Sequence, residues 1–547
     1  MSEIKVCKNC SGKFEVADLD NSFYKKINVS TPTYCPDCRQ QRRLAFRNER
    51  NLFKRRCDMC ERQIISFFEA GTVFPVYCTE CWWTDKWDPL SYGQDFDFSR
   101  PFFEQFKELM MKVPKMGMLH LNNENSEYNA LLAFSKNTYM SPGSYLMEDC
   151  YYVRKSQFCS NCLNSNFLDH CELMVYSVNC NSCYNCSNLV NCRNCTDSQY
   201  LENCSSCQSC FMCSDVSNKK YCFKNKQYSE EEYSKIVQDK LAMSRGQLLT
   251  EFREFVKTIP KKYQNQINCE NSSGDYLQNC KNALDCYDCF EVEDSRYLIE
   301  SVGVKDSMDL SMHDKEVELC YELSSGGDSS YNVKFSFCPC TSKNCDYLYN
   351  CFNLQDCFGC DSIHLKLKNC ILNKQYSEDD YKQLRTKIVQ HMGESGEWGE
   401  FFPIELSLYP YNLTLAQDYY PLTEEQAFAK GFKWKKKDTA HYREETGSLP
   451  DQIRDVPDSI IKEVLVCRHC TKNYQVISQE LSLSRKLNQP VSKYCSDCRQ
   501  LELMSFKNPR KLWKRNCSKC TAEIESTYSL KRQERVYCEK CYLAEVY

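Results

Sequence analysis

Sixteen cysteines of the chain occur in Cys-x-x-Cys pairs, four pairs near each end. Such a pair forms a tight turn that aims two sulfurs at one ion, and two pairs complete a tetrahedral thiolate site. Each of the three intervals between successive pairs has the same length at the N-terminal end as at the C-terminal end, and the first interval is the longest. We therefore interpret the ends as copies of one double metal module. The pairs are Cys7 and Cys10, Cys35 and Cys38, Cys57 and Cys60, Cys78 and Cys81, Cys467 and Cys470, Cys495 and Cys498, Cys517 and Cys520, and Cys538 and Cys541.

The ligand types predict structural zinc. Every position of all four sites is cysteine, which leaves no open position for water or substrate, and we expect no histidine beside the ions. Four structural zinc ions are therefore expected, and no residue is assigned a catalytic role. Consecutive pairs are the simplest pairing within each module, and a cross-braced pairing stays open. Units with so small a core gain much of their folding energy from the metal.

A strongly basic segment lies between the two sites of each module. Residues 39–56 predict a helix with Leu44, Phe46, Leu52 and Phe53 on its inner face and basic residues outside. Such basic density can neutralise phosphates, so nucleic acid is the first candidate partner, either RNA, the ribosome or DNA. A solvated face and arginines packed on acidic neighbours are the alternatives. The candidate nucleic-acid-binding residues are Arg39, Arg42, Arg43, Arg47, Arg50, Lys54, Arg55, Arg499, Lys507, Arg510, Lys511, Lys514 and Arg515.

Charge is divided unevenly along the chain. The net charge is −4, yet residues 1–60 carry 13 Lys and Arg against 7 Asp and Glu, and residues 460–547 carry 17 against 9. Residues 61–459 therefore carry −18. Basic ends around an acidic middle favour partners at the ends, or ends that dock on the middle. The nucleic-acid hypothesis requires one exposed face shared by Arg43, Arg47, Arg50, Arg510 and Lys514.

Composition limits the class of protein. A chain of 547 residues with 42 cysteines is expected to form several folding units. A secreted disulfide scaffold is one interpretation. Against it, residues 1–30 hold no apolar run of signal-peptide type, and zinc-spaced pairs require thiolates. We therefore expect a reducing, cytoplasmic setting. The sequence lacks an apolar stretch of about 18 residues, which predicts no membrane span.

The middle of the chain is a repeat. The cysteines from Cys150 to Cys222 are separated by multiples of three, and a period of about 21 residues aligns columns such as Cys150, Cys171, Cys192 and Cys213. Small residues stacked at a fixed period of about 20 indicate a β-solenoid whose coils are the repeats. We expect free thiols to fill its narrow core. Metal or iron–sulfur ligation and disulfides are the alternatives.

The repeat is itself duplicated. Residues 225–233 and 373–381 both begin Asn-Lys-Gln-Tyr-Ser, and Ser229 with Glu232 makes a capping box for a helix that closes the first solenoid. The expected fold is mostly β, with two consecutive β-solenoid units of about 21 residues per coil and their capping helices between double zinc-ribbon or treble-clef modules. The expected domains are a zinc module (1–83), an aromatic connector and helix (84–119), a Cys-rich solenoid with its capping helix (120–264), a second solenoid with its capping helix (265–392), an aromatic connector (393–459) and a second zinc module (460–547).

Several segments resemble known sequences. Residues 6–14 and 35–39, Val-Cys-Lys-Asn-Cys-Ser-Gly-Lys-Phe and Cys-Pro-Asp-Cys-Arg, resemble the zinc-ribbon domain of treble-clef character. Residues 39–57, 82–90 and 95–106, both Asn-Lys-Gln-Tyr-Ser stretches and residues 421–427 resemble a family of uncharacterised zinc-ribbon and Cys-rich-repeat proteins from reduced-genome candidate-phylum bacteria. The resemblance covers most of the chain. It implies zinc at both ends and a bacterial cytoplasmic setting, and it implies no activity.

Three functions fit the sequence. The first is a non-catalytic zinc protein whose terminal modules bind nucleic acid while the solenoid spaces them. The second is a scaffold that binds protein partners. The third, and the weakest, is a carbohydrate-active enzyme on the solenoid face, because the seven histidines are dispersed and no phosphate loop, nucleophile elbow or dinucleotide motif occurs. The sequence leaves the oligomeric state open.

Overall fold

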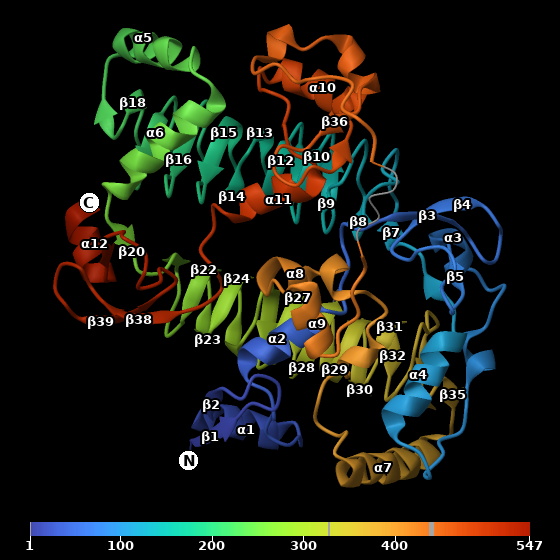
Figure 1. The fold of residues 1–547 in the computed structure, drawn as a ribbon. Helices are drawn as coiled ribbons and strands as arrows, with labels where there is room; N and C mark the ends of the chain where they lie inside the picture. The colour runs from blue at the N-terminus through green and yellow to red at the C-terminus, as the bar shows by residue number, and fades with distance from the viewer. Residues whose placement is uncertain (1, 327–328, 437–441, 547) are drawn as a thin grey trace.

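The computed structural model describes residues 2–326, 329–436 and 442–546 (Figure 1). Strands predominate, and most belong to two 13-stranded, largely parallel sheets within residues 120–227 and 266–368. The described helices are all too short or too polar to cross a membrane. The fold is therefore mostly β, as predicted.

The first parallel sheet, called here the first stack, begins after a connector. Its connector holds η1 (Pro89–Tyr92), α4 (Phe102–Lys112) and β6 (Lys115–Met116). The strands of the first stack are β7 His120–Leu121, β8 Leu132–Ala133, β9 Tyr145–Glu148, β10 Tyr151–Arg154, β11 Gln157–Ser160, β12 Leu163–Asp169, β13 Glu172–Val175, β14 Val178–Asn181, β15 Tyr184–Val190, β16 Gln199–Glu202, β17 Phe211–Ser214, β18 Cys222–Phe223 and β19 Lys226–Gln227.

The second stack follows the helices α5 (Glu230–Leu241) and α6 (Arg245–Lys257) and the strand β20 (Lys261–Lys262). Its strands are β21 Gln266–Ile267, β22 Gly274–Gln278, β23 Lys281–Leu284, β24 Cys286–Phe290, β25 Glu293–Arg296, β26 Val302–Lys305, β27 Met308–Glu318, β28 Tyr321–Gly326, β29 Tyr331–Cys340, β30 Lys343–Asp346, β31 Tyr349–Phe352, β32 Leu354–Gln355 and β33 Leu367–Lys368. β34 (Cys370–Ile371) and β35 (Lys374–Gln375) follow as a two-stranded antiparallel hairpin.

The strands pair at a spacing of twelve residues. Tyr151 lies beside Leu163, and Gly274 lies beside Cys286. Left-handed backbone recurs at every third residue, for example from Asn179 to Asn194, so each twelve-residue turn has four corners. Asparagine and aspartate tolerate this conformation best among side chains with a Cβ atom, and they occupy many of the corners. The second stack is less regular, since its spacing reaches thirteen residues between β27 and β28.

The predicted period of the repeat is therefore wrong. An inward-facing side chain recurs every third residue, so columns of cysteines align at any multiple of three. The values 12 and 21 both satisfy that pattern, and cysteine positions by themselves do not choose between them. Backbone pairing chooses 12, because neighbouring strands must lie within hydrogen-bonding distance.

Thiols fill most of the interior of the first stack and share the interior of the second with aliphatic side chains. The described cysteines are all free of disulfide bonds, and those of the first stack are buried. Cys183 illustrates their hydrogen bonding: its Sγ contacts the carbonyl of Asn181 at 3.4 Å and that of Cys192, nine residues on, at 3.7 Å. These contacts match the expectation of free thiols that act as small apolar side chains with a weak donor.

Helices follow each stack, as the capping signals predicted. Ser229 accepts from the backbone of Glu232 at the start of α5, and Ser377 accepts from Asp380 at the start of α7 (Glu378–Ser395). α6 packs on β16 and β17 through Leu248, and α7 contacts β34. Figure 1 shows the first helix pair at one end of the first stack and α7 beside the second stack.

Each terminal module contains two small ribbons separated by a helix. A connector between the second stack and the C-terminal module holds η2 (Ile404–Leu406), η3 (Tyr411–Leu413), α8 (Leu415–Tyr419), α9 (Glu424–Ala429), η4 (Ile453–Asp455) and η5 (Asp458–Lys462). The N-terminal module consists of β1 Glu3–Val6, β2 Lys13–Val16, α1 Asp18–Lys26, α2 Pro36–Leu44, β3 Phe53–Arg56, β4 Gln63–Ser66, β5 Val76–Tyr77 and α3 Thr79–Trp82. The C-terminal module consists of β36 Leu465–Val466, β37 Asn473–Tyr474, α10 Ser478–Lys486, α11 Ser496–Met504, β38 Trp513–Asn516, β39 Glu523–Ser526, β40 Val536–Tyr537 and α12 Glu539–Val546.

The helix predicted over residues 39–56 is shorter than expected. α2 ends at Leu44, and residues 53–56 form β3 of the second ribbon. Leu44 and Phe46 are fully buried, as predicted, whereas Leu52 and Phe53 are half-buried. The helix stops early because residues 53–56 pair with β4, a contact that local periodicity does not reveal.

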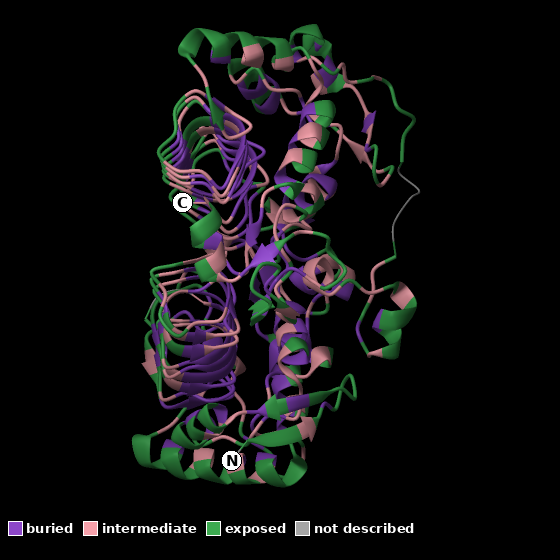
Figure 2. Ribbon diagram, turned by 90° about the vertical axis from the view of Figure 1, so that its left-hand side faces the viewer, coloured by how far each residue is buried: buried purple, intermediate pink, exposed green. Residues whose placement is uncertain are grey.

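The modules cross between the two stacks. The stacks lie side by side, and Figure 2 looks along both of them. β5 of the N-terminal module pairs with β6, just before the first stack, while α2 packs on β27 and β28 of the second stack. β40 of the C-terminal module pairs with β20, just before the second stack, while α11 packs on β12 of the first. Each module therefore bridges both stacks.

Candidate metal centres

The sixteen cysteines gather into four groups, and in each group the ligand atoms lie within 4.8 Å of one another. Consecutive pairs share a group in both modules, so the simple pairing is confirmed and the cross-braced alternative is wrong. The groups are Cys7, Cys10, Cys35 and Cys38; Cys57, Cys60, Cys78 and Cys81; Cys467, Cys470, Cys495 and Cys498; and Cys517, Cys520, Cys538 and Cys541.

The spacing of the sulfurs fits one tetrahedral ion in each group. Metal–sulfur bonds of about 2.3 Å in a tetrahedron place two sulfurs about 3.8 Å apart. The Sγ atoms of Cys10 and Cys35 lie 3.8 Å apart, and the equivalent distances in the other groups are 3.9, 3.5 and 3.8 Å. The thiol sulfurs here stand for the thiolates that would bind a metal. The donor set suits zinc or iron.

Backbone geometry prepares each group for anionic sulfur. The residue after the first pair has left-handed backbone in all four ribbons, at Ser11, Glu61, Thr471 and Thr521. This turn aims N–H groups at the first sulfur. Burial by itself raises the pKa of Cys7, but backbone N–H groups, that of Cys35 foremost, lower it to about 6.

In each module, one side chain contacts a sulfur of the first four-cysteine group, and this contact was not predicted from the sequence. In the N-terminal module, Asn9 Nδ2 donates to Cys38 Sγ at 3.2 Å. The equivalent residue of the C-terminal module is His469, whose Nδ1 lies 3.4 Å from Cys498 Sγ. The expectation of no histidine beside the ions is therefore wrong. The signal was in the sequence, because His469 lies inside its Cys-x-x-Cys pair.

The basic residues of α2 face the second stack. Arg39 donates from Nε to Asp309 at 2.9 Å, and Arg43 donates from Nη1 to the same carboxylate at 3.1 Å. Arg42 contacts Glu322 at 3.0 Å. Their pairing leaves these guanidinium groups no surface for an external phosphate.

The arginines that follow α2 are also engaged. Arg47 pairs with Glu49 at 2.7 Å, and Arg50 makes a two-pronged contact with Asp418 at 2.6 and 2.7 Å. Arg55, in β3, donates to a backbone carbonyl of its own ribbon at 2.7 Å. Each guanidinium is thus used inside the molecule.

The C-terminal module repeats this arrangement on the first stack and at the junction. Arg499, equivalent to Arg39, is buried; it pairs with Glu480 of its own module at 2.6 Å and donates to Asn164 Oδ1 of the first stack at 3.2 Å. Arg510 pairs with Asp288 of the second stack at 2.9 Å, and Lys507 pairs with the same carboxylate.

The exposed basic face required for nucleic-acid binding is therefore not formed. Among the thirteen candidates, Lys54, Lys511 and Lys514 are exposed, and Arg515 is half-buried with a hydrogen bond to the carbonyl of Tyr528 at 3.2 Å. The other nine are buried or nearly so. Buried charges need partners, and the acidic middle of the chain supplies those of six of these nine residues, which agrees with the alternative of ends docked on the middle. The other three, Arg47, Arg55 and Arg499, pair with carboxylates of their own modules.

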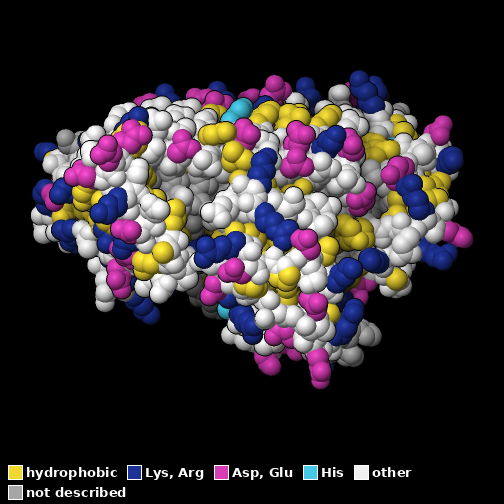
Figure 3. Space-filling view, turned by 90° about the horizontal axis from the view of Figure 1, so that it is seen from above, with side chains coloured by type: hydrophobic (Ala, Val, Ile, Leu, Met, Phe, Trp, Pro, Cys, Tyr) yellow, Lys and Arg dark blue, Asp and Glu magenta, His cyan; other side chains and the backbone are white. Residues whose placement is uncertain are grey.

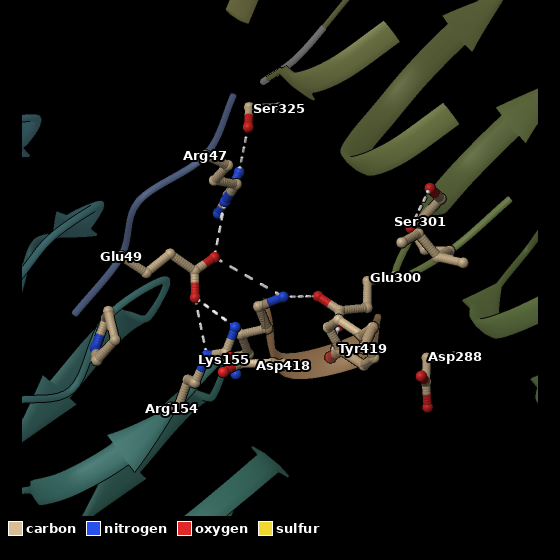
Figure 4. Close-up of polar contacts among 12 residues, drawn as sticks. Arg47, Glu49, Arg154, Lys155, Asp288, Glu300, Ser301, Ser325, Asp418 and Tyr419 are labelled. Atoms are coloured by element: carbon tan, nitrogen blue, oxygen red, sulfur yellow. Dashed lines mark hydrogen bonds and ion pairs between the residues drawn. The ribbon is translucent and has the colours of Figure 1, made fainter. Parts of the chain in front are cut away.

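A buried ion network joins all parts at the junction of the stacks. Figure 4 shows Glu49 between Arg47, Arg154 and Lys155, with Lys155 also reaching Glu300. No side chain in the network is more than 11% exposed. It contains five cations and three anions, namely Arg47, Arg154, Lys155, Lys507, Arg510, Glu49, Asp288 and Glu300.

Comparisons with known proteins give no family. No protein-family model matches the chain, and no curated protein matches it. Solved structures that match include a crystal structure of a protein described as an acetyltransferase from Desulfovibrio desulfuricans G20. It is 8% identical, with a TM-score of 0.11, over 48% of this chain and 69% of that one. So low a TM-score carries no argument about fold or function.

Proposed function

We propose that the protein is a non-catalytic, zinc-dependent scaffold in which two terminal modules clamp a pair of β-solenoids. The observation that carries the proposal is the bridging of both stacks by each module. β5 reaches the start of the first stack while Arg43 is buried on the second, and β40 reaches the start of the second stack while Arg499 donates to Asn164 of the first. Each ribbon has little hydrophobic core of its own, so bound zinc stabilises the ribbon fold and thereby holds these anchors in place.

Zinc is the ion we assign to the four groups. An all-cysteine tetrahedral set without an open position is typical of structural zinc. Iron would take the same geometry, so the metal is tested directly. Native mass spectrometry with elemental analysis is expected to find four zinc ions per chain. Iron in these groups would overturn the assignment.

An exposed apolar row on the first stack supports a scaffold that binds protein. The rings of Phe134, Tyr145 and Phe158 lie on successive turns, with centroids 5.6 and 5.8 Å apart, and His170 stacks on Phe158 at 4.5 Å. Each of the three rings is more than 40% exposed. Figure 3 shows hydrophobic side chains gathered in a row beside a histidine at one edge of the molecule. Contiguous exposed aromatic surface marks interaction sites, and interfaces are enriched in such residues.

The docking face can be tested by cross-linking in native extracts. Lys136, whose side chain is about half exposed, lies on the turn between Phe134 and Tyr145 and offers an amine. Cross-links from Lys136 to a protein partner are expected in the wild type and are expected to disappear in a Phe134→Ala, Phe158→Ala double variant. Tyr184→Ala, an exposed aromatic elsewhere on the same stack, is the matched control and should keep them. Cross-links that persist in the double variant would place the partner elsewhere.

The clamp is tested by metal removal. A chelator is expected to release zinc and to open the segments that carry the buried arginines. Hydrogen exchange should then rise in α2 and in α11 while the interiors of the stacks remain protected. Unchanged protection of both helices after complete zinc loss would contradict the clamp.

A further inference from the structure

A cavity of about 700 Å³ lies where the two stacks, the connector and both modules meet. Its wall includes Asp37 and Gln40 of α2, Asn166 of β12, Tyr287 of β24 and the segment around Arg510 after α11. The volume is in the range of pockets that hold small ligands. Since five parts of the chain build the wall, the cavity exists only when both clamps are closed.

Six aromatic rings form much of this wall: Phe167, Tyr276, Tyr287, Tyr419, Tyr420 and Trp513. Cations of the chain hold three of them in place. Lys507 Nζ lies 4.2 Å from the ring centre of Phe167 and 4.3 Å from that of Tyr276, and Arg510 lies 4.1 Å from that of Tyr419. Fixed rings offer flat surfaces on which a planar ligand can stack.

One cation of the wall is available to an anionic group. Lys507, Arg510 and Asp288 belong both to the wall and to the buried ion network, in which cations exceed anions by two. Lys511 adds a further ammonium group that has no ion pair within the described residues. Burial lowers the pKa of Lys507, and the neighbouring Asp288 offsets this effect only in part.

The wall also contains four carboxylates, those of Asp37, Asp275, Asp288 and Asp418, and two of them have cationic partners. Asp418 is already paired with Arg50, and Asp275 accepts hydrogen bonds from Thr527 and from the backbone N–H of Asn265. Asp37 is exposed and belongs to α2, whereas Lys511 comes from the segment after α11.

Amide and hydroxyl groups provide hydrogen-bonding partners for the edge of a ring. Asn166 is fully buried, and its Oδ1 has no partner in the part of the chain that the structure describes. Gln40 accepts from Tyr420, which leaves its amide N–H₂ to donate. Such amides pair with the hydrogen-bonding edges of nucleobases.

From these observations we propose that the cavity binds a nucleotide, with the planar base stacked among the aromatic side chains and the phosphate beside Lys511 and Arg510. Aromatic walls account for the base, amide and carboxylate groups for its edge, and Lys511, which has no ion pair within the described residues, for the phosphate. The nucleotide is either free or the end of a single strand. The site shares Lys507, Arg510 and Lys511 with the basic residues that the sequence suggested, but it is a cavity and not an exposed basic face, because most of the suggested arginines are buried.

Isothermal titration calorimetry on the full zinc-loaded chain tests the proposal. AMP, GMP, CMP and UMP report the complete ligand, adenosine lacks the phosphate, and ribose 5-phosphate lacks the base. At least one mononucleotide is expected to bind about tenfold more tightly than either fragment. A 5′-phosphorylated pentanucleotide separates the two sources: tighter binding than the mononucleotide identifies a strand end, and weaker binding identifies the free nucleotide.

Two matched variants locate the site. Lys511→Ala is expected to weaken mononucleotide binding by about tenfold, because it removes the unpaired cation of the wall. Lys514→Ala removes an exposed lysine three residues away that is outside the wall, and it should leave binding unchanged. Four retained metal ions in both variants would show that the fold is intact. No binding of any mononucleotide at about 1 mM, or equal binding by wild type and Lys511→Ala, overturns the proposal.

Discussion

Arg43 donates from Nη1 to Oδ1 of Asp309 at 3.1 Å, and both side chains are fully buried. The two residues are separated by 266 positions in the chain. Arg39 binds the other oxygen of the same carboxylate, so one aspartate of the second stack anchors two arginines of α2. This contact shows how a basic terminal segment becomes an internal clamp.

Arg43→Ala is expected to destabilise the protein strongly. It leaves Asp309 with one cation fewer in a buried site, and breaking one partner of a buried pair costs about 3–5 kcal/mol. Urea unfolding followed by circular dichroism measures the change. Lys54→Ala, which alters an exposed basic residue of β3, is the control and should change stability by about 0.5 kcal/mol or less. Equal effects of the two substitutions would contradict a clamping role for Arg43.

Cys35→Ser is expected to lower the metal content from four ions to three. Cys35 lies in a four-sulfur group, and a hydroxyl does not replace its thiolate. Cys171→Ser changes a cysteine inside the first stack and should keep four ions. Native mass spectrometry distinguishes the two variants. Metal loss from Cys171→Ser would show that stack cysteines bind metal as well.

Duplex DNA and duplex RNA are expected to bind weakly. Most arginines that could neutralise phosphates are paired inside the molecule, and Lys54, Lys511 and Lys514 are the exposed members of the set. Filter binding at 50 and 200 mM salt measures affinity and its salt slope, which grows with the number of phosphates contacted. Tight binding with a steep slope would require the modules to open.

Acid stability should depend on Glu49. Burial raises the pKa of this carboxyl, but Arg154, Lys155 and Arg47 outweigh burial and hold it well below its ordinary value. A carboxyl whose pKa is depressed by folding stabilises the protein above its unfolded pKa, about 4.3, and this contribution is lost as the pH falls below that value.

Glu49→Gln therefore should be less stable than wild type at pH 7, and the difference should shrink as the pH is lowered below about 4.5. Thermal unfolding at a series of pH values measures the difference in stability between wild type and Glu49→Gln. Release of metal in acid affects both proteins alike, so it does not change this difference. Glu231→Gln, on the exposed side of α5, is the control and should track the wild type. If the stability difference between wild type and Glu49→Gln stays constant across the pH series, the loss of stability comes from packing and not from the charge of Glu49.

Cysteines inside the stacks should resist alkylation in the native protein. Burial raises the pKa of Cys320 to about 12, and only the thiolate reacts. Cys269 and Cys340 are half-buried and should react first among the stack cysteines. Mass spectrometry of iodoacetamide-treated protein measures the labelling, with unfolded protein as the positive control. Fast labelling of Cys320 would show that the stacks open readily.

Repeats were found in the sequence, but their length was not. Every third position between Cys150 and Cys222 faces inward, and the sequence shows this spacing directly. The number of sides per turn depends on which strands pair, and side-chain columns at multiples of three fit several answers. One further signal points to the corners, since an asparagine precedes Cys162, Cys192 and Cys195 and adopts left-handed backbone.

Helix boundaries show the same contrast between what local sequence encodes and what depends on strand pairing. The capping box of Ser229 and Glu232 predicted α5, because the contact lies within four residues. The end of α2 at Leu44 was missed, since it depends on β3 pairing with β4 across the ribbon. Local signals thus located helix starts, whereas strand pairing decided where one of them had to stop.

The sequence by itself determined the metal centres and the basic character of the segments beside them. Each group of four sulfurs is built from two short turns, and short turns are encoded by residues close together in the chain. Only the tertiary structure decided which way the arginines point. Arg39 and Arg43 meet Asp309, and Arg510 meets Asp288, although the partners of each pair are far apart in the chain. Desolvation makes such pairing obligatory once the stacks approach, so the fold and not the composition turns a basic surface into an interior clamp.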